Sequence, residues 1–429
     1  MHKHSVTWLS LFVIVAVMFL QLPPLVARQD SVLNTYRALV EVDALARQNY
    51  IDAIEDDRLV HGAIRGMMFQ LDPYSGYLAP EELSAFERRS AGDYSGIGVE
   101  IGMLGGRPTI IAPFEASPAA RAGLRAGDTI VSIDGEDVEG RSIFDIEERL
   151  VGPPGTTVHV RVLHPGQGDP VDAAVLRGRV SIHTVHGYRR DAARAWDYFI
   201  DRPGRIGYLR LSDFRDNTMR DVDAALESMF AEGLRGLIID LRFNPGGLME
   251  QAGAMVDRFV DEGLILSTVT RRGAVQEYAA TGPGTVSDVA LAVLINGGSG
   301  SSSEIVAGAL QDHGRAIVVG ERSFGKGSVQ HLIRLRSYEA AIKLTVAYYR
   351  LPGGRIIHRT PANERTDEWG VIPDVRVELS DQEEHALLES WRTSDLPAQQ
   401  ATAPDQAEPQ QDRQLAAALA NLIERMARR

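Results

Sequence analysis

Hydrophobic and polar positions follow three different patterns along the chain. Between residues 31 and 86 apolar residues recur at spacings of three and four, which predicts helices. Between 92 and 180 short runs rich in β-branched residues are separated by Gly and Asp, which predicts a β-rich module. Between 204 and 380 strand-like and helix-like patterns alternate, and this alternation predicts an α/β core built on a largely parallel sheet.

The elements expected in the second and third regions can be placed one by one. In the β-rich module we expect strands at 98–101, 109–112, 129–133, 157–163 and 173–176, and helices at 119–122 and 143–150. In the α/β region we expect strands at 205–211, 236–241, 264–270, 290–295 and 316–320, helices at 218–231, 248–260 and 303–311, and further β-like segments at 329–335 and 341–349. Before these regions, residues 72–76 read Asp-Pro-Tyr-Ser-Gly and predict a turn.

The N-terminus has the character of a targeting segment. Lys3 precedes an almost wholly apolar stretch, Val6 to Leu22, which ends at two prolines. The stretch is short for a membrane span and slightly long for the apolar region of a signal peptide, so both cleavage and anchoring remain open. A buried core helix is the weaker alternative, because the stretch lacks helical amphipathicity. We therefore expect an exported protein, periplasmic or anchored on the outer face of the inner membrane.

The C-terminal region changes character twice. Residues 394–411 are rich in Pro, Gln and Ala, a composition typical of a disordered linker. Leu415, Leu419, Leu422, Ile423 and Met426 then form a helical stripe. We expect this last helix to dock on the body of the protein or on a partner.

Composition narrows the class of protein. The 429 residues are enough for two or three domains. The net charge of −13 gives no sign of the basic face that nucleic-acid binders carry, so no nucleic acid is expected as a partner. The chain has no cysteine, which excludes disulfides, thiolate metal sites and a cysteine nucleophile.

Lysine is unusually rare in this chain. Only Lys3, Lys326 and Lys343 occur among the 45 basic residues, so arginine is used almost wherever a positive charge is needed. A lysine, unlike an arginine, can lose its proton inside a protein. Lys326 is therefore a candidate general base, provided that burial lowers its pKa from about 10.4 toward roughly 7–8. For Lys343 chance codon usage is the simpler explanation.

Two segments at predicted strand-to-helix turns are rich in small residues. Residues 296–304 read Asn-Gly-Gly-Ser-Gly-Ser-Ser-Ser-Glu, and residues 240–247 read Asp-Leu-Arg-Phe-Asn-Pro-Gly-Gly. Exposed N–H groups and hydroxyls at such turns favour a phosphate or a developing oxyanion. A helix N-cap with Glu304 as the capping-box acid, and a plain turn at 240–247, are equally compatible with these residues.

A third segment, residues 320–327, nearly matches the phosphate-binding loop pattern G-x-x-x-x-G-K-[ST]. Gly327 stands where the pattern needs a hydroxyl, and the residues after it are β-like rather than helical. Nucleotide binding is therefore disfavoured, and a serine–lysine dyad becomes the better use of Lys326. The histidines form no triad or metal-binding pattern, so we expect no metal or other cofactor.

Together these segments resemble the C-terminal processing peptidases, also called tail-specific proteases. Residues 117–135 are PDZ-like, and residues 95–99 are similar to the carboxylate-binding loop of a PDZ domain. The remaining segments that follow the family's order are 71–82, 240–247, 296–304, 320–330 and 370–374. The resemblance implies a crotonase- or ClpP-like α/β protease core with an inserted PDZ-like, β-rich domain and a helical N-terminal region.

The roles known in the family carry over to matching positions. The resemblance implies that Ser301 is the nucleophile, Lys326 the general base and Gln330 the residue that orients the lysine. It also implies an oxyanion hole made by Gly247 and the backbone N–H of Ser302. The expected chemistry is attack by Ser301 on a peptide bond, followed by hydrolysis of an acyl-enzyme.

The assignment of the nucleophile depends on the alignment. Ser299, Ser302 and Ser303 flank Ser301, and Gly300 stands where the family commonly has alanine. We take Ser301 as the expected nucleophile, with Ser303 as the main alternative.

The PDZ-like module suggests how a substrate is selected. A free C-terminus would add as an extra strand, with its carboxylate received by N–H groups near Gly96, Ile97, Gly98 and Val99. Ile97 and Val99 are candidates for lining an apolar pocket, and their alternative role is plain strand core. The whole module has alternatives too, namely structural packing or binding of a regulatory protein.

We therefore expect five parts in the chain. They are a signal peptide or membrane anchor at 1–27, an N-terminal helical region at 28–90, a PDZ-like domain at 91–180, an α/β peptidase core at 181–380, and a linker with a C-terminal helix at 381–429. The N-terminal helical region is a candidate dimerisation element, so a homodimer or higher oligomer is expected.

The expected function is that of an exported serine endopeptidase that cleaves proteins near their C-termini. Its partners would be protein or peptide substrates with free C-termini. Two alternatives come from other classes: a catalytically inactive PDZ scaffold that binds C-termini, and a crotonase-type acyl-CoA enzyme. The joint presence of Ser301, Lys326 and Gln330 argues against the first, and the PDZ-like segment argues against the second.

Overall fold

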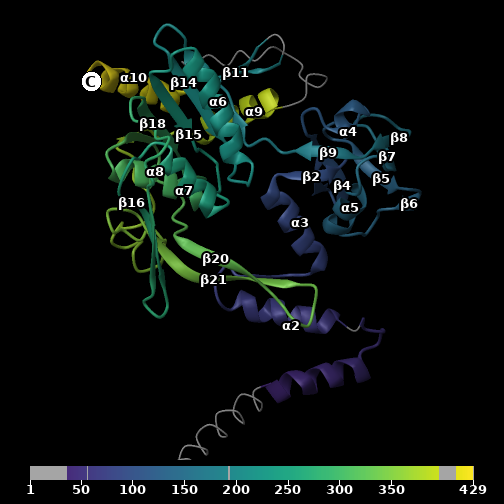
Figure 1. Cartoon of the computed structure of the whole chain (residues 1–429). Helices are drawn as coiled ribbons and strands as arrows, with labels where there is room; N and C mark the ends of the chain where they lie inside the picture. Colours follow the sequence, from purple (N-terminus) through teal and green to yellow (C-terminus); the bar gives the residue numbers. More distant parts are fainter. Residues whose placement is uncertain (1–35, 56, 192–193, 396–411, 429) are drawn as a thin grey trace, which may run out of the picture. The chain divides into compact units, whose positions relative to one another are not determined.

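The computed structural model describes residues 36–55, 57–191, 194–395 and 412–428 (Figure 1). The chain divides into two compact units, Met1–Pro73 and Tyr74–Arg429. The helices of the first unit are residues 36–49 and α2 (Arg58–Phe69). The predicted signal or anchor at 1–27 lies outside the described residues. Within the described ranges no helix combines the length and the apolar character that crossing a membrane requires.

The second unit contains a six-stranded antiparallel sheet, in the region where the β-rich module is predicted. Its strands and helices are β3 (Val99–Leu104), β4 (Arg107–Pro113), β5 (Thr129–Ile133), β6 (Glu136–Asp137), β7 (Thr157–Leu163), β8 (Val171–Leu176), α4 (Pro118–Arg121) and α5 (Ile143–Leu150). Val158, Val160 and Val162 of β7 are buried and alternate with outward-facing residues, as the two-residue period of a strand requires. The expected strand and helix positions of this module are therefore confirmed to within a few residues.

A two-stranded ribbon connects the module to the rest of its unit. The chain enters through β2 (Asp93–Gly96) and leaves through β9 (Gly178–Ser181), and the two strands pair antiparallel. The helix α3 (Pro80–Ala91) leads directly into β2. Because the entering and leaving strands pair with each other, the β-rich module is an insertion whose two ends lie next to each other.

The central sheet of residues 181–380 has seven strands. Its parallel strands, in spatial order, are β14 (Ile206–Leu211), β15 (Gly236–Asp240), β18 (Ala290–Ile295), β19 (Ala316–Gly320) and β22 (Val375–Arg376). Two short strands, β10 (Val185–His186) and β13 (Phe199–Asp201), pair antiparallel with β14. A separate two-stranded ribbon consists of β11 (Arg189–Arg190) and β12 (Trp196–Asp197). The predicted parallel sheet is thus present, with an antiparallel edge.

The prediction of one continuous α/β sheet misses a second sheet. Residues 264–270 and the β-like segments after 328 form this separate antiparallel sheet. Its strands are β1 (Gly76–Leu78), β16 (Leu264–Thr270), β17 (Val275–Ala279), β20 (Ser328–Arg334) and β21 (Ala341–Arg350). Sequence periodicity identifies strands but does not assign them to a sheet, because pairing is decided by contacts between distant residues.

Alternation along the parallel strands divides the core into two layers. Odd-numbered residues such as Leu291, Val293 and Ile295 of β18 pack against the helices α6 (Thr218–Ala231), α7 (Met249–Asp257) and α8 (Ser302–Asp312). The even-numbered residues of the same strand face α10 (Arg413–Ala427). Leu415, Ala418 and Leu422 of α10 are buried against the sheet. Of the two docking sites expected for the C-terminal helix, the structure shows the body of its own chain.

One helix near the C-terminus is absent from the sequence prediction. α9 (Asp381–Asp395) is amphipathic only weakly and is strongly charged at its start. Trp391 is its main anchor, since the Arg210 and Arg242 guanidiniums lie over its ring, 4.7 and 5.2 Å from the centroid. A helix held by cation–π contacts rather than by an apolar stripe gives little periodic signal.

We predict that Leu422→Ala destabilises the peptidase region by about 2–5 kcal/mol, because it opens a cavity between α10 and the sheet. The adjacent Ile423 is 47% exposed, so Ile423→Ala should change stability by no more than about 0.5 kcal/mol. Denaturant unfolding followed by tryptophan fluorescence measures both. Equal effects of the two substitutions would show that α10 does not pack on the sheet in solution.

Candidate active site

Three loops that follow parallel strands meet at one edge of the central sheet. They are the segments 241–248 after β15, 296–301 after β18 and 321–327 after β19. In an open parallel sheet the carboxyl ends of the strands form the usual binding crevice. The sequence segments singled out for their small residues and their lysine are therefore brought together by the order of the strands.

Ser301 has an unusual backbone conformation. It stands at the start of α8 with φ 53° and ψ −112°, a region that residues other than glycine rarely adopt. Such a conformation costs about 1–3 kcal/mol and persists only where the surroundings enforce it. The Ser301 side chain is half-buried, and its Oγ makes no hydrogen bond to any residue that the structure describes.

The three neighbouring serines differ from Ser301 in this respect. The hydroxyls of Ser299, Ser302 and Ser303 are buried and each donates a hydrogen bond to a backbone oxygen. The acceptors are Leu241, Gly247 and Asn244, at 2.8, 2.9 and 2.9 Å respectively. Their hydroxyls stabilise the turn, whereas the Ser301 hydroxyl is left available.

Two glycines shape the backbone next to Ser301. A Cβ on Gly246 would lie 2.7 Å from the Cβ of Ser301, and a Cβ on Gly247 would lie 2.1 Å from the Phe214 carbonyl oxygen. Both also have positive φ, 109° and 145°. The N–H groups of Gly247 and Ser302 donate no hydrogen bond within the described part of the chain, as an oxyanion hole requires.

Glu304 ties the nucleophile turn to the lysine loop. Its carboxylate is fully buried and accepts four hydrogen bonds. Oε2 accepts from the backbone N–H groups of Ser301 and Lys326, both at 2.8 Å, and Oε1 accepts from Gly325 N–H at 2.7 Å and from the Ser323 hydroxyl. Burial raises the pKa of Glu304, and these four donors act in the opposite direction. The sequence suggests only its helix-capping contact to Ser301.

Tyr349 of β21 makes a second connection between the same two residues. Its hydroxyl lies 3.1 Å from the Ser301 carbonyl oxygen and 2.9 Å from the Lys326 carbonyl oxygen. The ring is buried, and burial raises the pKa of its hydroxyl well above the ordinary value, so it remains a donor. No sequence signal indicates this residue, because it comes from the other sheet.

The Lys326 ammonium is in a partly desolvated position. Burial is the main cause that lowers its pKa, the charge of Lys343 lowers it further, and Glu304 acts in the opposite direction. Nζ lies over the ring of Tyr74, 5.2 Å from the centroid, and makes no hydrogen bond to the described residues. A lysine with a lowered pKa is the kind of general base that the sequence predicts. The structure also gives Lys343 an electrostatic role.

Gln330 lies close to this lysine loop but contacts other side chains. Its Nε2 donates to Ser328 Oγ at 2.9 Å and to Thr345 Oγ1 at 3.2 Å. Thr345 N–H in turn donates to Ser75 Oγ at 3.1 Å. The structure thus joins the backbones of Ser301 and Lys326, while no hydrogen bond links the side chains of Ser301, Lys326 and Gln330.

The predicted carboxylate-binding loop lies beside a cavity of about 420 Å³. Gly96 ends β2, Val99 begins β3, and Ile97 and Gly98 form the turn between them. Ile97 is a fully buried member of the module's core and also lines this cavity. The opposite wall of the cavity belongs to the peptidase region and includes Arg215.

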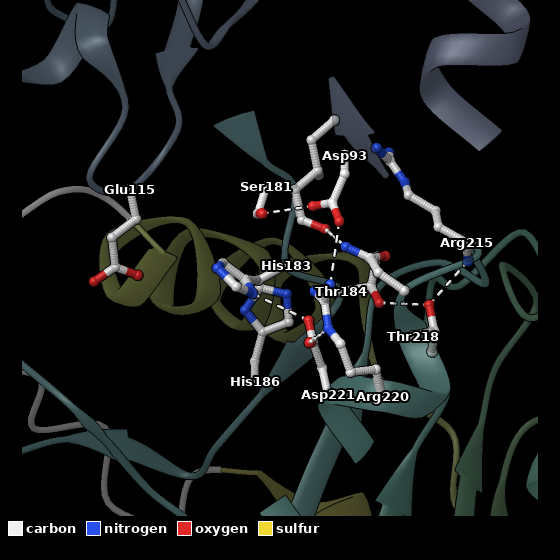
Figure 2. Close-up of polar contacts among 12 residues, drawn as sticks. Asp93, Glu115, Ser181, His183, Thr184, His186, Arg215, Thr218, Arg220 and Asp221 are labelled. Carbon is white, nitrogen blue, oxygen red and sulfur yellow. Dashed lines mark hydrogen bonds and ion pairs between the residues drawn. The ribbon is translucent and has the colours of Figure 1, made fainter. Parts of the chain in front are cut away.

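Polar contacts beside this cavity join the ribbon of β2 and β9 to α6 (Figure 2). Asp93 of β2 accepts hydrogen bonds from the Ser181 hydroxyl and from Arg220 Nη1, the latter at 3.1 Å. His183 Nδ1 lies 3.0 Å from Asp221 Oδ2, and this contact raises the pKa of His183. These contacts hold the base of the inserted module against α6.

Comparison with known proteins supports the resemblance seen in the sequence. Peptidase family S41 matches residues 205–377, the PDZ domain family matches 110–163, and the activating protease CtpB N-terminal domain matches 26–82. A carboxy-terminal-processing protease of Bartonella bacilliformis is 36% identical over 353 residues, which cover 80% of this chain and 76% of the relative. This chain belongs to the C-terminal processing peptidase family. As a member, it is a serine peptidase with a PDZ domain and a mixed α/β fold.

Further relatives have the same family name. A carboxyl-terminal-processing protease of Synechocystis is 36% identical over 340 residues, covering 78% of this chain and 75% of the relative. Among solved structures, a photosystem II D1 C-terminal processing protease is 32% identical and covers 76% of this chain and 84% of its own, with a TM-score of 0.44. The family prediction made from the sequence is thus confirmed.

We predict that Glu304→Gln lowers kcat/KM of this C-terminal processing peptidase by about 100-fold or more. A glutamine would turn its NH2 group toward backbone N–H groups, and a displacement of about 1 Å at a reacting group costs that much. Glu383→Gln, a surface substitution at the start of α9, is the matched control. Peptidase assays and thermal unfolding should be run on both. Full activity of Glu304→Gln would contradict the bridging role.

We predict that Lys343→Met moves the acidic limb of the pH–activity profile to higher pH. A general-base lysine acts in its neutral form, so activity falls as the pH drops below its pKa. The Lys343 charge lowers the pKa of Lys326, and removing that charge raises it again. The measurement is kcat/KM against pH, with Arg376→Met on β22 as the charge-matched control. An unmoved limb in Lys343→Met would show that the Lys343 charge does not act on the group that titrates.

Proposed function

We propose that this chain is an endopeptidase that cleaves proteins near their C-termini, with Ser301 as nucleophile and Lys326 as general base. The observation that carries the proposal is the site around Ser301. Its hydroxyl is the one among four neighbouring serines without a hydrogen bond in the described structure, and two unpaired N–H groups lie beside it. This combination serves acyl transfer rather than structural capping.

The reaction follows from these groups. The neutral Lys326 amine accepts the Ser301 proton while Oγ attacks the peptide carbonyl carbon. The Gly247 and Ser302 N–H groups donate to the oxygen that becomes negative. Lys326, now an ammonium, gives its proton to the leaving amine as the peptide bond breaks, and an ester to Ser301 remains. A water molecule then attacks the ester, with Lys326 again accepting and returning the proton.

The proposal needs one side-chain movement. The backbones of Ser301 and Lys326 share Glu304 and Tyr349 as partners, so their separation is fixed. The lysine side chain, which lies over Tyr74, must rotate until Nζ reaches Ser301 Oγ. In that position the side-chain oxygen of Gln330, Oε1, is proposed to orient the ammonium. This atom accepts no hydrogen bond within the described residues.

Substrate selection is proposed to occur at the PDZ-like module. An extended C-terminal segment would pair with β3, and its carboxylate would lie at the Gly96–Val99 loop beside the cavity. Binding of the tail there brings the preceding part of the substrate into the same unit as Ser301. Protein or peptide chains with free C-termini are therefore the proposed substrates.

Several finer expectations remain proposals. We propose export on the apolar stretch from Val6 to Leu22, with residues 1–27 either cleaved or retained as an anchor. The five-part division of the chain, a crotonase- or ClpP-like fold of the core, oligomerisation through the helical region at 28–90 and a regulatory protein at the PDZ-like module are proposals of the same kind.

We predict that Ser301→Ala and Lys326→Ala each lower the cleavage rate by a factor on the order of 10⁴. The assay follows proteolysis on a gel. The enzyme is the full chain, and the substrate is a loosely folded protein that ends in small apolar residues. Ser303→Ala is the matched control, since this hydroxyl is buried and bonded to the Asn244 carbonyl oxygen, and it should keep activity within about tenfold.

The same assay separates the alternatives. Cleavage that survives Ser301→Ala but not Ser303→Ala would move the nucleophile to Ser303. Absence of cleavage by the unaltered chain, with the tail still bound, would favour a scaffold. Cleavage that is equally fast with an amidated C-terminus would remove the tail-recognition part and leave the dyad in place.

A further inference from the structure

The cavity beside the carboxylate-binding loop has walls from three different elements. Ile97 and Gly98 of the PDZ-like module form one wall, Arg215 of the peptidase region forms the second, and Arg88 of α3 contributes to a third. Its volume of about 420 Å³ is in the range of ligand-binding cavities. Unpaired hydrogen-bond donors are found on each of these walls.

The first donor is a backbone N–H group. Gly98 N–H donates no hydrogen bond within the described part of the chain. Gly98 has φ 77°, and a Cβ there would lie 2.5 Å from the Ser117 Cβ, so the tight turn requires glycine. An unpaired backbone N–H group in such a turn can donate to a bound anion.

The second donor belongs to the peptidase region. Arg215 Nε donates to Asp213 Oδ2 at 3.0 Å, whereas its Nη1 is buried and has no hydrogen-bond partner among the described residues. In Figure 2 its side chain extends from the backbone contact with Thr218 toward the strand that carries Asp93. A buried guanidinium N–H without an acceptor is costly, and a carboxylate is its best acceptor.

The third donor is Arg88 on α3. Its Nη2 is likewise buried without a partner in the described structure, and Nη1 lies 3.6 Å from Glu148 Oε1. Both Arg88 and Arg215 act electrostatically on the Tyr94 hydroxyl, whose pKa is raised mainly by burial. The two guanidiniums therefore lie near the same ring of β2.

Arg88 and Arg215 each pair with one carboxylate that does not line the cavity, Glu148 and Asp213, and each keeps one buried N–H group without a partner among the described residues. Three of the lining carboxylates are already paired with basic side chains: Glu147 with Arg89, Glu115 with Arg190, and Asp395 with His186 and Arg210. A fourth, Glu100, is exposed on β3. A bound anion would thus meet Arg88 and Arg215 without displacing an existing ion pair inside the cavity.

We propose that Arg215, assisted by Arg88, completes the carboxylate site of the PDZ-like module and receives the α-carboxylate of a protein C-terminus. The proposal rests on the proposed function, which places the tail in this groove. It adds that half of the site comes from the peptidase region. A tail can then bind tightly only while the module and the peptidase region are in contact.

The position of Arg215 also links the tail to the reacting groups. Its neighbour Phe214 donates its N–H to Gly246 O at 3.0 Å and accepts the Leu248 N–H at 2.8 Å. These two bonds flank Gly247, whose N–H is assigned to the oxyanion hole. A carboxylate held by Arg215 therefore steadies the segment that shapes that hole, which makes Arg215 a positioning residue.

The test measures binding of a labelled decapeptide that ends in Ala-Val-Ala, with either a free carboxylate or a carboxamide. Fluorescence anisotropy uses the full chain with Ser301→Ala, so that no peptide is cut. We expect the free acid to bind about tenfold or more tightly than the amide. Arg215→Gln should lower this acid-to-amide ratio by about tenfold and leave the affinity for the amide unchanged.

Two further variants act as controls. Arg161→Gln removes the same charge from an exposed arginine of β7 that pairs with Asp172 and does not line the cavity, and it should keep the ratio. Arg215→Lys should restore part of the ratio, because it retains the charge. In chains with Ser301 intact, Arg215→Gln should raise KM and lower kcat for the free acid.

The outcomes separate this inference from the proposed function. If the parent prefers the free acid and Arg215→Gln keeps that preference, the role of Arg215 is wrong while tail recognition stands. If the parent shows no preference, tail recognition at this loop and the role of Arg215 are both wrong. Should Arg215→Gln unfold, as judged by circular dichroism, Arg88→Gln must lower the ratio on its own, or the proposal fails.

Discussion

One buried carboxylate holds the candidate active site together. Glu304 accepts hydrogen bonds from the backbone of Ser301 on one side and from the backbone of Lys326 on the other. Two loops that approach from different strands are thereby locked at a single separation. The strained backbone of Ser301 depends on this lock, because a positive φ at a serine persists only where its neighbours over-determine it. The Glu304 carboxylate can be buried because it accepts four hydrogen bonds, which offset the loss of its hydration.

The central sheet positions the two loops that Glu304 connects, and the C-terminal helix α10 contributes to this arrangement. Arg242, two residues after β15, is fully buried and forms ion pairs with Asp240 and with Asp412, which caps the start of α10. Tyr208 donates to Asp240 from the neighbouring strand at 2.8 Å. A charge pair at this depth is stable only with all partners present. The C-terminal helix is thus joined to the loop that leads to Gly247, although the two are far apart in sequence.

Sequence reasoning succeeded where the information is local. The period of apolar residues located the parallel strands β15, β18 and β19 and the helices between them, and therefore the loops that converge at the site. It could not separate β16 and β21 from that sheet, because strand pairing is a long-range property. It likewise missed Tyr349 and Tyr74, which reach the site from β21 and from the segment before β1. The choice of Ser301 over Ser303 also came from alignment alone, and only the hydrogen-bond partners of each hydroxyl give a physical reason for it.

The surroundings of Lys326 support the proposed role of this residue, which a lysine can fulfil and an arginine cannot. Burial and the Lys343 charge favour the neutral amine, whereas Glu304 favours the ammonium, as does the face of the Tyr74 ring. A base that accepts a proton from serine and then donates it to a leaving amine must be able to occupy both forms. The net effect is a lowered pKa of Lys326, which favours the neutral amine that a general base needs. An arginine would remain charged under the same conditions, so the geometry of the loop would be preserved while its chemistry would be lost.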